Sequence, residues 1–341
     1  MTPSPFDPIA WLQANLEWDR TDSAAFIYER MASQSGYSLP VLYAPFDGGR
    51  RDHVIDRGQI LDFAHALRVG RASCARILDF GPGDGWPALL VALLIAPMAG
   101  EVVGVDGSPR RVAVCRSNAA RLGIQNARFI HAPPGASLPF DDGVFDGVTA
   151  ASSLEQTPDP RATLRELRRV LKPGGRLRMS YESLSFYRGG REREIDVIED
   201  GEQAHMVIYD RRPDEEITRH YGLSIARGRQ TPAYAGLTEE VLVELAQRAT
   251  RAATWTTQHP SCATWLRWLD EAGFSATPTH NGGWFAGRLF DTLPESGRLR
   301  SVDEVDAMLS PLVKIVCEMP APPIARPGEW EPWITAISRR E

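Results

Sequence analysis

The sequence has few of the features that mark secreted or membrane-spanning proteins. Its four cysteines, in 341 residues, form no C-x-x-C pair, which excludes a dense disulfide framework and fits buried free thiols in a reducing compartment. The longest apolar run, Ala88–Ala99, is shorter than the roughly 20 residues that cross a bilayer. Residues 1–10 lack a basic-then-apolar leader. We therefore expect a cytoplasmic protein without a membrane span.

An excess of positive charge is also absent. The formal net charge is −6, which disfavours a nucleic-acid partner because nothing global attracts a polyphosphate. Hydrophobic residues make up 43% of the chain and charged residues 24%, an ordinary globular composition. The length allows one large α/β domain with additions, or two domains.

Clusters of metal ligands and a hydrolase nucleophile motif are likewise missing. The seven histidines are dispersed, and although His259 and Cys262 could share a helical turn, no further ligands are indicated beside them. No G-x-S-x-G follows a strand pattern. The sequence therefore predicts no metal site and no serine hydrolase.

The chain is organised around Ile77–Ala88, which begins as a short apolar run typical of a buried strand. Glycines then stand at 81, 83 and 85, and Pro87 precedes an apolar segment. We interpret this stretch as a strand, a glycine turn and a buried helix. Backbone N–H groups at such a helix start favour negative charge, and glycines let a ligand approach the backbone. A dinucleotide fingerprint would need a third glycine at Trp86, so this motif is a different one.

A second strand pattern, Glu101–Val105, ends in Asp106, which lies 25 residues after Gly81. A carboxylate at that place can accept both hydrogen bonds of a ribose diol. The alternative role is an N-cap for the helix that begins near Pro109. The position after a strand, at this separation from the glycine turn, favours the ribose role.

Several motifs in order resemble one enzyme family. The D-x-G-x-G-x-G pattern at 79–85 resembles the class I S-adenosylmethionine (AdoMet) methyltransferases. The segments LPFDDGVFDGV at 138–148, LEQTPDP at 154–160 and LKPGG at 171–175 are similar to the subgroup that includes the ubiquinone and menaquinone C-methyltransferases. The resemblance covers about residues 77–182, and EAGF at 271–274 resembles the family's turn into its sixth strand.

The resemblance implies a Rossmann-like, doubly wound seven-strand α/β sheet of order 3-2-1-4-5-7-6. Ile77–Phe80 would be the central first strand, and Trp333–Ser338 would run antiparallel between strands five and six. We divide the chain into an N-terminal helical cap, the AdoMet-binding core, a substrate-covering antiparallel β insertion and the C-terminal completion of the sheet, at residues 1–72, 73–182, 183–260 and 261–341.

The resemblance also implies a set of AdoMet-binding residues. They lie at the ends of the first four strands and comprise Asp79, Phe80, Gly81, Pro82, Gly83, Asp106, Gly107, Ser108, Arg111, Pro133, Pro134, Gly135, Ala151, Ser152 and Gln156. The chain departs from the family at Pro134, where members carry an acid for the adenine amino group. We therefore expect backbone groups and apolar contacts to hold adenine here.

The acceptor site is less well marked, because methyl transfer needs a general base only when the acceptor loses a proton. We name Glu155 and His205 as candidate catalytic residues, with Glu182 and His131 behind them. Tyrosines that could line a substrate pocket are Tyr28, Tyr37, Tyr43, Tyr181 and Tyr187. We expect a small-molecule acceptor; the alternatives are a protein or RNA methyltransferase and a non-catalytic AdoMet-binding protein.

Two segments outside the core are expected to cover the site. These are the aromatic-rich stretch 37–46 and a hairpin at 192–209, where Asp200-Gly201 separates two alternating runs. The rival role for both is a homodimer interface. Apolar spacing elsewhere predicts helices over 8–18, 22–34, 238–254, 261–272 and 302–316, and a strand over 285–289.

Overall fold

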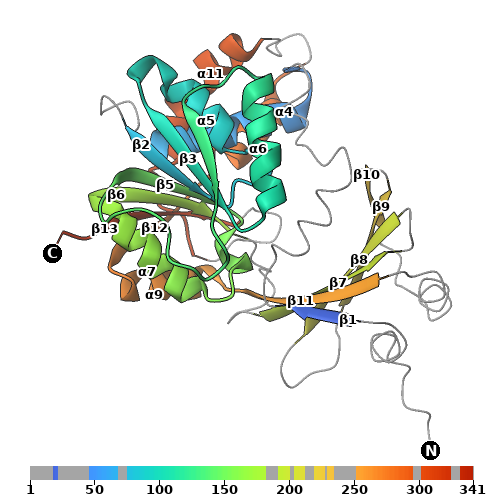
Figure 1. Cartoon of the computed structure of the whole chain (residues 1–341). Coiled ribbons are helices and arrows are strands. Elements are labelled where there is room, and N and C mark those ends of the chain that lie inside the picture. The colour runs from blue at the N-terminus through green and yellow to red at the C-terminus, as the bar shows by residue number, and fades with distance from the viewer. Residues whose placement is uncertain are drawn as a thin grey trace, which may run out of the picture. The chain divides into compact units, whose positions relative to one another are not determined.

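A computed structural model describes residues 18–21, 46–67, 75–181, 191–199, 203–211, 219–226, 229–233, 251–294, 301–323 and 331–340. The chain forms two compact units (Figure 1). One contains the strands between residues 191 and 259 together with the strand at 18–21. The other contains the glycine turn and the described elements before 182 and after 260, apart from that strand and Gln156–Pro158, which fall in the first unit. The units thus divide the predicted N-terminal cap, because the helix at 51–66 belongs to the second unit.

The first unit is a six-stranded sheet. Its strands run in the order β1 (Trp18–Thr21), β11 (Arg251–His259), β7 (Arg191–Glu199), β8 (Gln203–Arg211), β9 (Arg219–Ala226) and β10 (Arg229–Ala233). Every pair is antiparallel except β1 with β11. The predicted hairpin at Asp200-Gly201 is confirmed as β7 and β8. It is not a projecting arm, however, because β11 and β9 flank it on either side.

Two predicted helices overlap strands of this sheet. The helix predicted over 238–254 is wrong for its last four residues, where β11 begins, and the helix predicted over 8–18 is wrong at Trp18, where β1 begins. The remainder of both segments, and the helix predicted over 22–34, lie outside the described residues. Helical spacing of apolar residues does not exclude a strand, because hydrogen bonding to neighbouring strands can determine the secondary structure of a segment.

The second unit is built on a seven-stranded sheet in the order β12, β13, β6, β5, β2, β3, β4. The bounds are Arg76–Phe80 for β2, Glu101–Asp106 for β3, Ala127–His131 for β4, Phe145–Ala151 for β5, Leu171–Ser180 for β6, Phe274–Thr279 for β12 and Trp333–Ser338 for β13. The strand β13 is antiparallel to β12 and β6, and the other pairs of this sheet are parallel. The predicted order 3-2-1-4-5-7-6, with Ile77–Phe80 in the first strand, is therefore confirmed.

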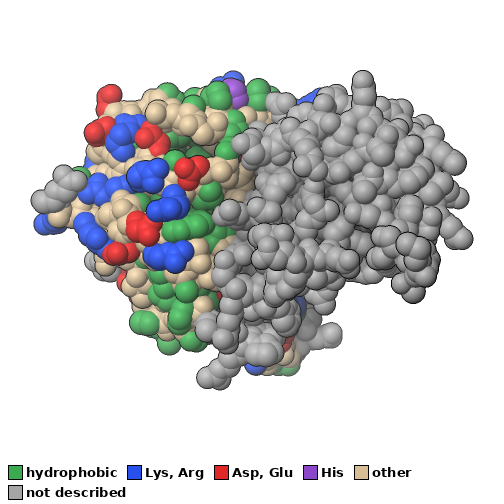
Figure 2. All heavy atoms as spheres, turned by 90° about the horizontal axis from the view of Figure 1, so that it is seen from below, with side chains coloured by type: hydrophobic (Ala, Val, Ile, Leu, Met, Phe, Trp, Pro, Cys, Tyr) green, Lys and Arg blue, Asp and Glu red, His purple; other side chains and the backbone are tan. Residues whose placement is uncertain are grey.

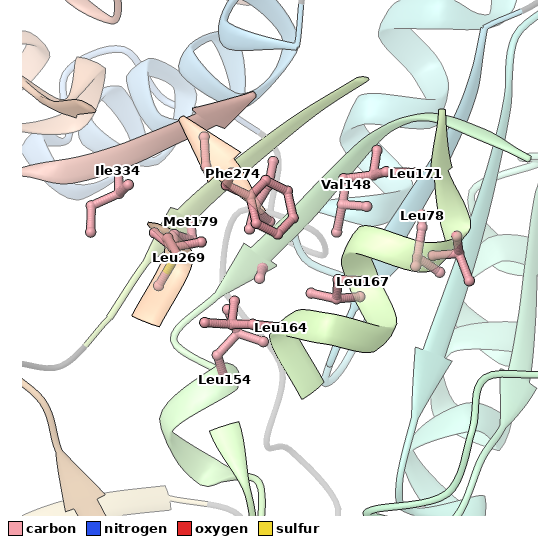
Figure 3. Packing of buried hydrophobic residues seen from close by; sticks show 14 of the residues in the cluster. Leu78, Val148, Leu154, Leu164, Leu167, Leu171, Met179, Leu269, Phe274 and Ile334 are labelled. Atoms are coloured by element: carbon pink, nitrogen blue, oxygen red, sulfur yellow. The ribbon is translucent and has the colours of Figure 1, made fainter. Parts of the chain in front are cut away.

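Helices cover both faces of this sheet (Figure 1). The helices are α4 (Arg51–Ala66), α5 (Ala88–Ile95), α6 (Pro109–Arg121), α7 (Pro160–Val170), α9 (Cys262–Glu271), α10 (Gly282–Thr292) and α11 (Val302–Val316), with short 3₁₀ turns at Ala96–Met98 and Leu154–Gln156. Alternate residues of β2 point to opposite sides. Leu78 joins a core with α7 and α9, and Ile77 joins one with α4, α5 and α6. Figure 3 shows Leu78 and Val148 on the side of Leu164 and Leu167.

The strand predicted over 285–289 is wrong, because this segment lies inside α10. Asn281 caps the helix by accepting a hydrogen bond from the Trp284 N–H at 2.6 Å. Glycines on its inner face let α10 pack closely on α4: a Cβ at Gly58 would lie 2.5 Å from the Gly282 carbonyl oxygen. Within 285–289, Ala286 and Gly287 are buried and Arg288 is exposed, the pattern of a packed helix rather than a strand.

A buried ion pair fixes α4 to the sheet. Arg178 of β6 donates from Nε and Nη2 to the two carboxylate oxygens of Asp62 at 2.7 and 2.9 Å, and both side chains are fully buried. The Arg178 guanidinium also donates to the hydroxyls of Thr279 and Thr335. Because every strong donor finds an acceptor, the pair joins α4, β6, β12 and β13 without leaving a charge unpaired.

The outer face of α7 and α9 carries basic and acidic side chains together (Figure 2). Arg161 of α7 pairs with Glu271 of α9 at 2.7 Å, and Arg169 pairs with Glu166 and Asp142. This intermingling forms no continuous basic surface over the two helices. Within the described ranges, no helix is long and apolar enough to cross a membrane.

Candidate functional site

The glycine turn that follows β2 lies at the carboxyl edge of the seven-stranded sheet. Gly81 and Gly83 have positive φ angles of 73° and 57°, which side chains rarely adopt. A Cβ at Gly81 would meet Ser153 at 2.5 Å, whereas a Cβ at Gly83 would meet no atom within 4 Å. Gly81 is therefore required by packing, while Gly83 borders open space where a ligand can approach the backbone.

Asp106, at the end of β3, holds this turn from the side. Its Oδ2 accepts a hydrogen bond from the Gly83 N–H at 3.2 Å, and its Oδ1 accepts one from the Ser108 N–H at 2.9 Å. Burial raises the pKa of Asp106, and the two N–H groups act in the opposite direction. Each carboxylate oxygen keeps a further lone pair, so the group can still accept hydrogen bonds from hydroxyls.

Asp79 lies beneath the turn and is fully buried. Its Oδ1 accepts from the Thr149 hydroxyl at 2.6 Å and its Oδ2 accepts from the Ala88 N–H at 3.0 Å. Burial raises the pKa of Asp79 to about 7. The side chain thus joins β2, β5 and the start of α5. The structure places this predicted ligand residue below the open face of the turn.

Arg111, another predicted ligand residue, forms a buried ion pair with Asp84 of the turn. Two further side chains of α6 hold the same turn: Cys115 donates from Sγ to the Gly83 carbonyl at 3.1 Å, and Asn118 donates to the Asp84 carbonyl at 2.8 Å. Sequence reasoning missed Asp84, Cys115 and Asn118. The spacing of Arg111, Cys115 and Asn118 on one helical face was the available signal.

The remaining predicted residues of the first two turns support the backbone. Ser108 caps α6 by accepting from the Arg111 N–H at 3.2 Å. The Phe80 carbonyl accepts from the Ser153 hydroxyl at 2.6 Å, and the Gly107 carbonyl lies 3.1 Å from His131 Nε2. Pro82 is buried.

The loop after β4 contains no carboxylate between His131 and Phe140. Pro133, Pro134 and Gly135 are exposed, and the turn is closed by a hydrogen bond from the Ala136 N–H to the Pro133 carbonyl at 3.1 Å. A Cβ at Gly135 would meet nothing within 4 Å. This loop can offer backbone groups and proline rings to a ligand.

At the end of β5, Ala151 and Ser152 are partly exposed. Ser152 has a positive φ of 48°, a left-handed conformation that costs energy for a residue with a side chain. Its N–H donates to the Ser180 carbonyl at 3.2 Å, and the two hydroxyl oxygens lie 3.3 Å apart. Gln156 follows in the 3₁₀ turn at Leu154–Gln156. The Ser152–Ser180 pair adds hydroxyl groups to this edge.

Glu155 and Tyr181 follow β5 and β6 at the same edge, and both are buried. Tyr181 contacts Cys262 and packs on Trp265, with ring centroids 6.1 Å apart. Burial raises the pKa of the Tyr181 hydroxyl, as do Cys262 and the charges of Glu331 and Glu155.

Apart from Glu155, Tyr181 and His131, only His205 among the candidates for the acceptor site is described, and it belongs to the first unit. His205 lies on β8, opposite Ile198 and Ser224 in the strand pairing of the first unit. Tyr28, Tyr37, Tyr43, Tyr187 and Glu182 lie outside the described residues. In the part of the chain that the structure describes, no three His, Cys, Asp or Glu side chains form a group that could hold a metal ion. Cys115, Cys262 and Cys317 are free and buried, as the sequence predicts.

Comparison with known proteins finds sequence similarity over the segment that contains this edge. Residues 78–179 match a family of methyltransferase domains. Over 102 residues the chain is 45% identical to the demethylmenaquinone methyltransferase of Thermus thermophilus, covering 30% of this chain and 44% of that one. It is 36% identical over 111 residues to the arsenite methyltransferase of Aquipseudomonas alcaligenes, covering 31% of this chain and 32% of that one. The chain thus spans less than half the length of these curated relatives.

Among solved structures, AdoMet-bound CalS10, an amino pentose methyltransferase from Micromonospora echinaspora, is 17% identical to this chain. The superposition covers 83% of this chain and 91% of CalS10, with a TM-score of 0.43, which is too low to relate the two sites. The family match includes the glycine turn and Asp106. Residues 78–179 of the chain are therefore similar to a methyltransferase domain, and this segment carries the site described above.

Proposed function

We propose that this protein transfers a methyl group from AdoMet to a small-molecule acceptor. The observation that carries the proposal is the open backbone at Gly83 beside Asp106, at the carboxyl edge of a sheet with this strand order. No neighbouring atom fills the space beside the Gly83 backbone, so a ligand can approach it, and the Asp106 carboxylate keeps lone pairs that can accept hydrogen bonds. This combination suits a nucleoside joined to an amino acid.

The residues of this edge have distinct proposed roles. Asp106 accepts hydrogen bonds from the ribose hydroxyls, and the backbone of Gly81 and Gly83 faces the methionine half. Pro133–Gly135 supplies backbone and apolar contacts to adenine, because no carboxylate is available there. Asp79 supports the turn from below rather than binding the ammonium group, since its side chain is fully buried and bridges Thr149 and the Ala88 N–H.

When bound, AdoMet supplies an electrophilic methyl group. The chain's own part is to hold the acceptor nucleophile in line with that methyl group and to exclude water. Ser152 and Ser180 offer hydroxyls to orient a polar acceptor. If the acceptor must lose a proton, Glu155 is the candidate base, because it follows β5 at the same edge of the sheet.

The proposal of a small-molecule acceptor is supported by the names of two relatives, which act on two different small molecules. Those named above are methyltransferases for demethylmenaquinone and for arsenite, both small molecules. The net charge of −6 and the paired charges on α7 and α9 favour a small acceptor over an RNA.

Calorimetric titration with S-adenosylhomocysteine tests the cofactor site. We expect the wild-type protein to bind, and Asp106→Ala to weaken binding by about 1.5–3 kcal/mol, or roughly 10- to 150-fold, because hydrogen bonds to a charged acceptor are lost. Asp141→Ala, which removes an exposed carboxyl group, should bind like the wild type. Unchanged affinity in a folded Asp106→Ala protein would refute the ribose assignment.

A screen of metabolite extracts for transfer of a labelled methyl group then tests the reaction. A labelled small molecule supports the proposal. Label found only in protein or RNA would refute the acceptor class. Cofactor binding with no transfer to any fraction would favour a non-catalytic AdoMet-binding protein.

A further inference from the structure

One face of α6 packs against the glycine turn and supplies three side chains to it. Arg111, Cys115 and Asn118 stand four and three residues apart, so they project from the same side of the helix. All three act on two residues of the turn, Gly83 and Asp84. None of the three needs to touch the ligand to affect it.

The contacts hold the turn at several atoms. Gly83 donates its N–H to Asp106 and accepts at its carbonyl from Cys115. Asp84 accepts at its carbonyl from Asn118, and its carboxylate pairs with Arg111. Gly83 has a positive φ of 57°, and glycine otherwise populates many conformations in a loop. These bonds therefore select one backbone shape among many.

Burial makes these contacts difficult to replace by water. The Arg111 and Asp84 side chains are only 3% and 4% exposed, and Cys115 and Asn118 are buried as well. A buried polar group that loses its partner keeps its desolvation cost, so the turn gains by staying in this conformation. Arg111, which the sequence analysis predicts at the cofactor, is thus held in an ion pair with the turn.

We propose that α6 sets the affinity for the methionine half of the cofactor through Arg111, Cys115 and Asn118, which hold Gly83 and Asp84 in the binding conformation. They are positioning residues, and the inference rests on the proposed function. Asp106 also accepts a hydrogen bond from the Ser108 N–H, which the Cys115 and Asn118 side chains do not contact, so the ribose subsite depends less on these two side chains.

The test compares two probes, S-adenosylhomocysteine and 5′-methylthioadenosine, which carries the same nucleoside without the amino-acid part. We expect Cys115→Ala and Asn118→Ala each to bind S-adenosylhomocysteine about 3- to 10-fold more weakly, the effect of one lost hydrogen bond. Their affinity for methylthioadenosine should stay within twofold of the wild type. Cys115→Ser, which keeps a donor to the Gly83 carbonyl, should restore most of the affinity for S-adenosylhomocysteine.

Cys317→Ala is the matched control, because Cys317 is equally buried and donates to a carbonyl within α11. It should leave both affinities unchanged. If Cys115→Ala and Asn118→Ala fold and bind both probes as the wild type does, or weaken both equally, α6 has no such role. If Cys115→Ala or Asn118→Ala unfolds, the comparison of Cys115→Ser with the wild type decides. A large loss of affinity for S-adenosylhomocysteine in Cys115→Ser would also overturn the inference, because this variant keeps the hydrogen-bond donor. No binding of S-adenosylhomocysteine by the wild type would overturn the proposed function itself, and this inference with it.

Discussion

Among the described carboxyl groups, Asp79 shows how burial changes the pKa of a single residue. It has no exposed surface and receives hydrogen bonds only from Thr149 and the Ala88 N–H in the structure. Neither group is charged, so the cost of desolvation prevails and the pKa rises from 3.8 to about 7. Asp106 has a similar cause for its raised pKa but remains partly exposed at the edge of the site.

A pH dependence of stability follows for Asp79. The folded protein keeps this proton up to about pH 7, whereas the unfolded chain releases it near pH 3.8. Between these values the folded state binds more protons, so the free energy of unfolding should fall as the pH rises, by about 1.4 kcal/mol per unit. Asp79→Asn should lack this loss, and its difference from the wild type should change by about 2 kcal/mol between pH 5 and 7.

Urea unfolding at several pH values measures this difference. In the asparagine variant the amide can accept from the Ala88 N–H and donate to Thr149, so the site stays hydrogen-bonded. Asp141→Asn, at an exposed position, should follow the wild-type profile. Parallel profiles for Asp79→Asn and the wild type would contradict the raised pKa.

At the scale of elements, the contact of α4 with α10 depends on missing side chains. Gly58 and Gly282 face each other, and a Cβ on either would lie 2.5 Å from the other's carbonyl oxygen. Real atoms do not approach so closely, so the helices would have to separate. This contact places α10 and α11 on α4, and the Asp62–Arg178 pair then joins α4 to the sheet.

Gly58→Ala should therefore destabilise the protein. Overpacking costs about 1–3 kcal/mol, here toward the upper end because the obstacle is backbone, while the better helix propensity of alanine returns about 1 kcal/mol. We expect a net loss of about 1–2 kcal/mol in the free energy of unfolding, measured in urea. Gly49→Ala, where the methyl group meets only the Asp47 side chain, should change it by less than about 0.5 kcal/mol. A stabilised Gly58→Ala protein would show that the helices are not in this close contact.

At the scale of the whole molecule, two units have separate sheets. The described hydrophobic clusters around the seven-stranded sheet are formed by residues of its own strands and of the helices packed on them. That segment leaves after β6 and returns at α9, where the Tyr181 and Cys262 side chains touch. Its two ends are therefore close enough for a short linker to join them.

A chain of residues 46–341 with 183–259 replaced by a short glycine-serine linker tests what the first unit does. The N-terminal residues are removed as well, because β1 pairs with β11. We expect cooperative unfolding and binding of S-adenosylhomocysteine, since the core and the glycine turn remain. Methyl transfer should be lost if the removed unit encloses the acceptor.

Light scattering on the full-length and the shortened protein measures their oligomeric states and distinguishes enclosure of the acceptor from the rival role of a dimer interface. A shortened protein that changes from dimer to monomer and still methylates the acceptor would refute enclosure and support an interface. Deleting only residues 191–211 would not separate the two roles, because β7 and β8 lie between β11 and β9 and their loss would divide the sheet.

The sequence by itself determined the first two strands of the core and the location of its turn, while the strand order was implied by the family resemblance. Strand lengths, the glycines at 81, 83 and 85, and the acid at Asp106 are local patterns, and they predicted β2, β3 and the turn between β2 and α5. The Asp-Gly at 200–201 likewise predicted a hairpin. Such features depend on residues within a few positions of each other, so backbone propensity and alternation are sufficient.

The tertiary structure alone decided which side chains meet. Arg111 pairs with Asp84 across 27 positions and Asp79 with Thr149 across 70, so two predicted ligand residues are held by partners that are distant in the sequence. Packing on α4 made 285–289 helical, and pairing with β9 and β11 put the hairpin at the centre of its sheet. These outcomes depend on burial and on partners brought together by folding, which residue types and their spacing do not specify.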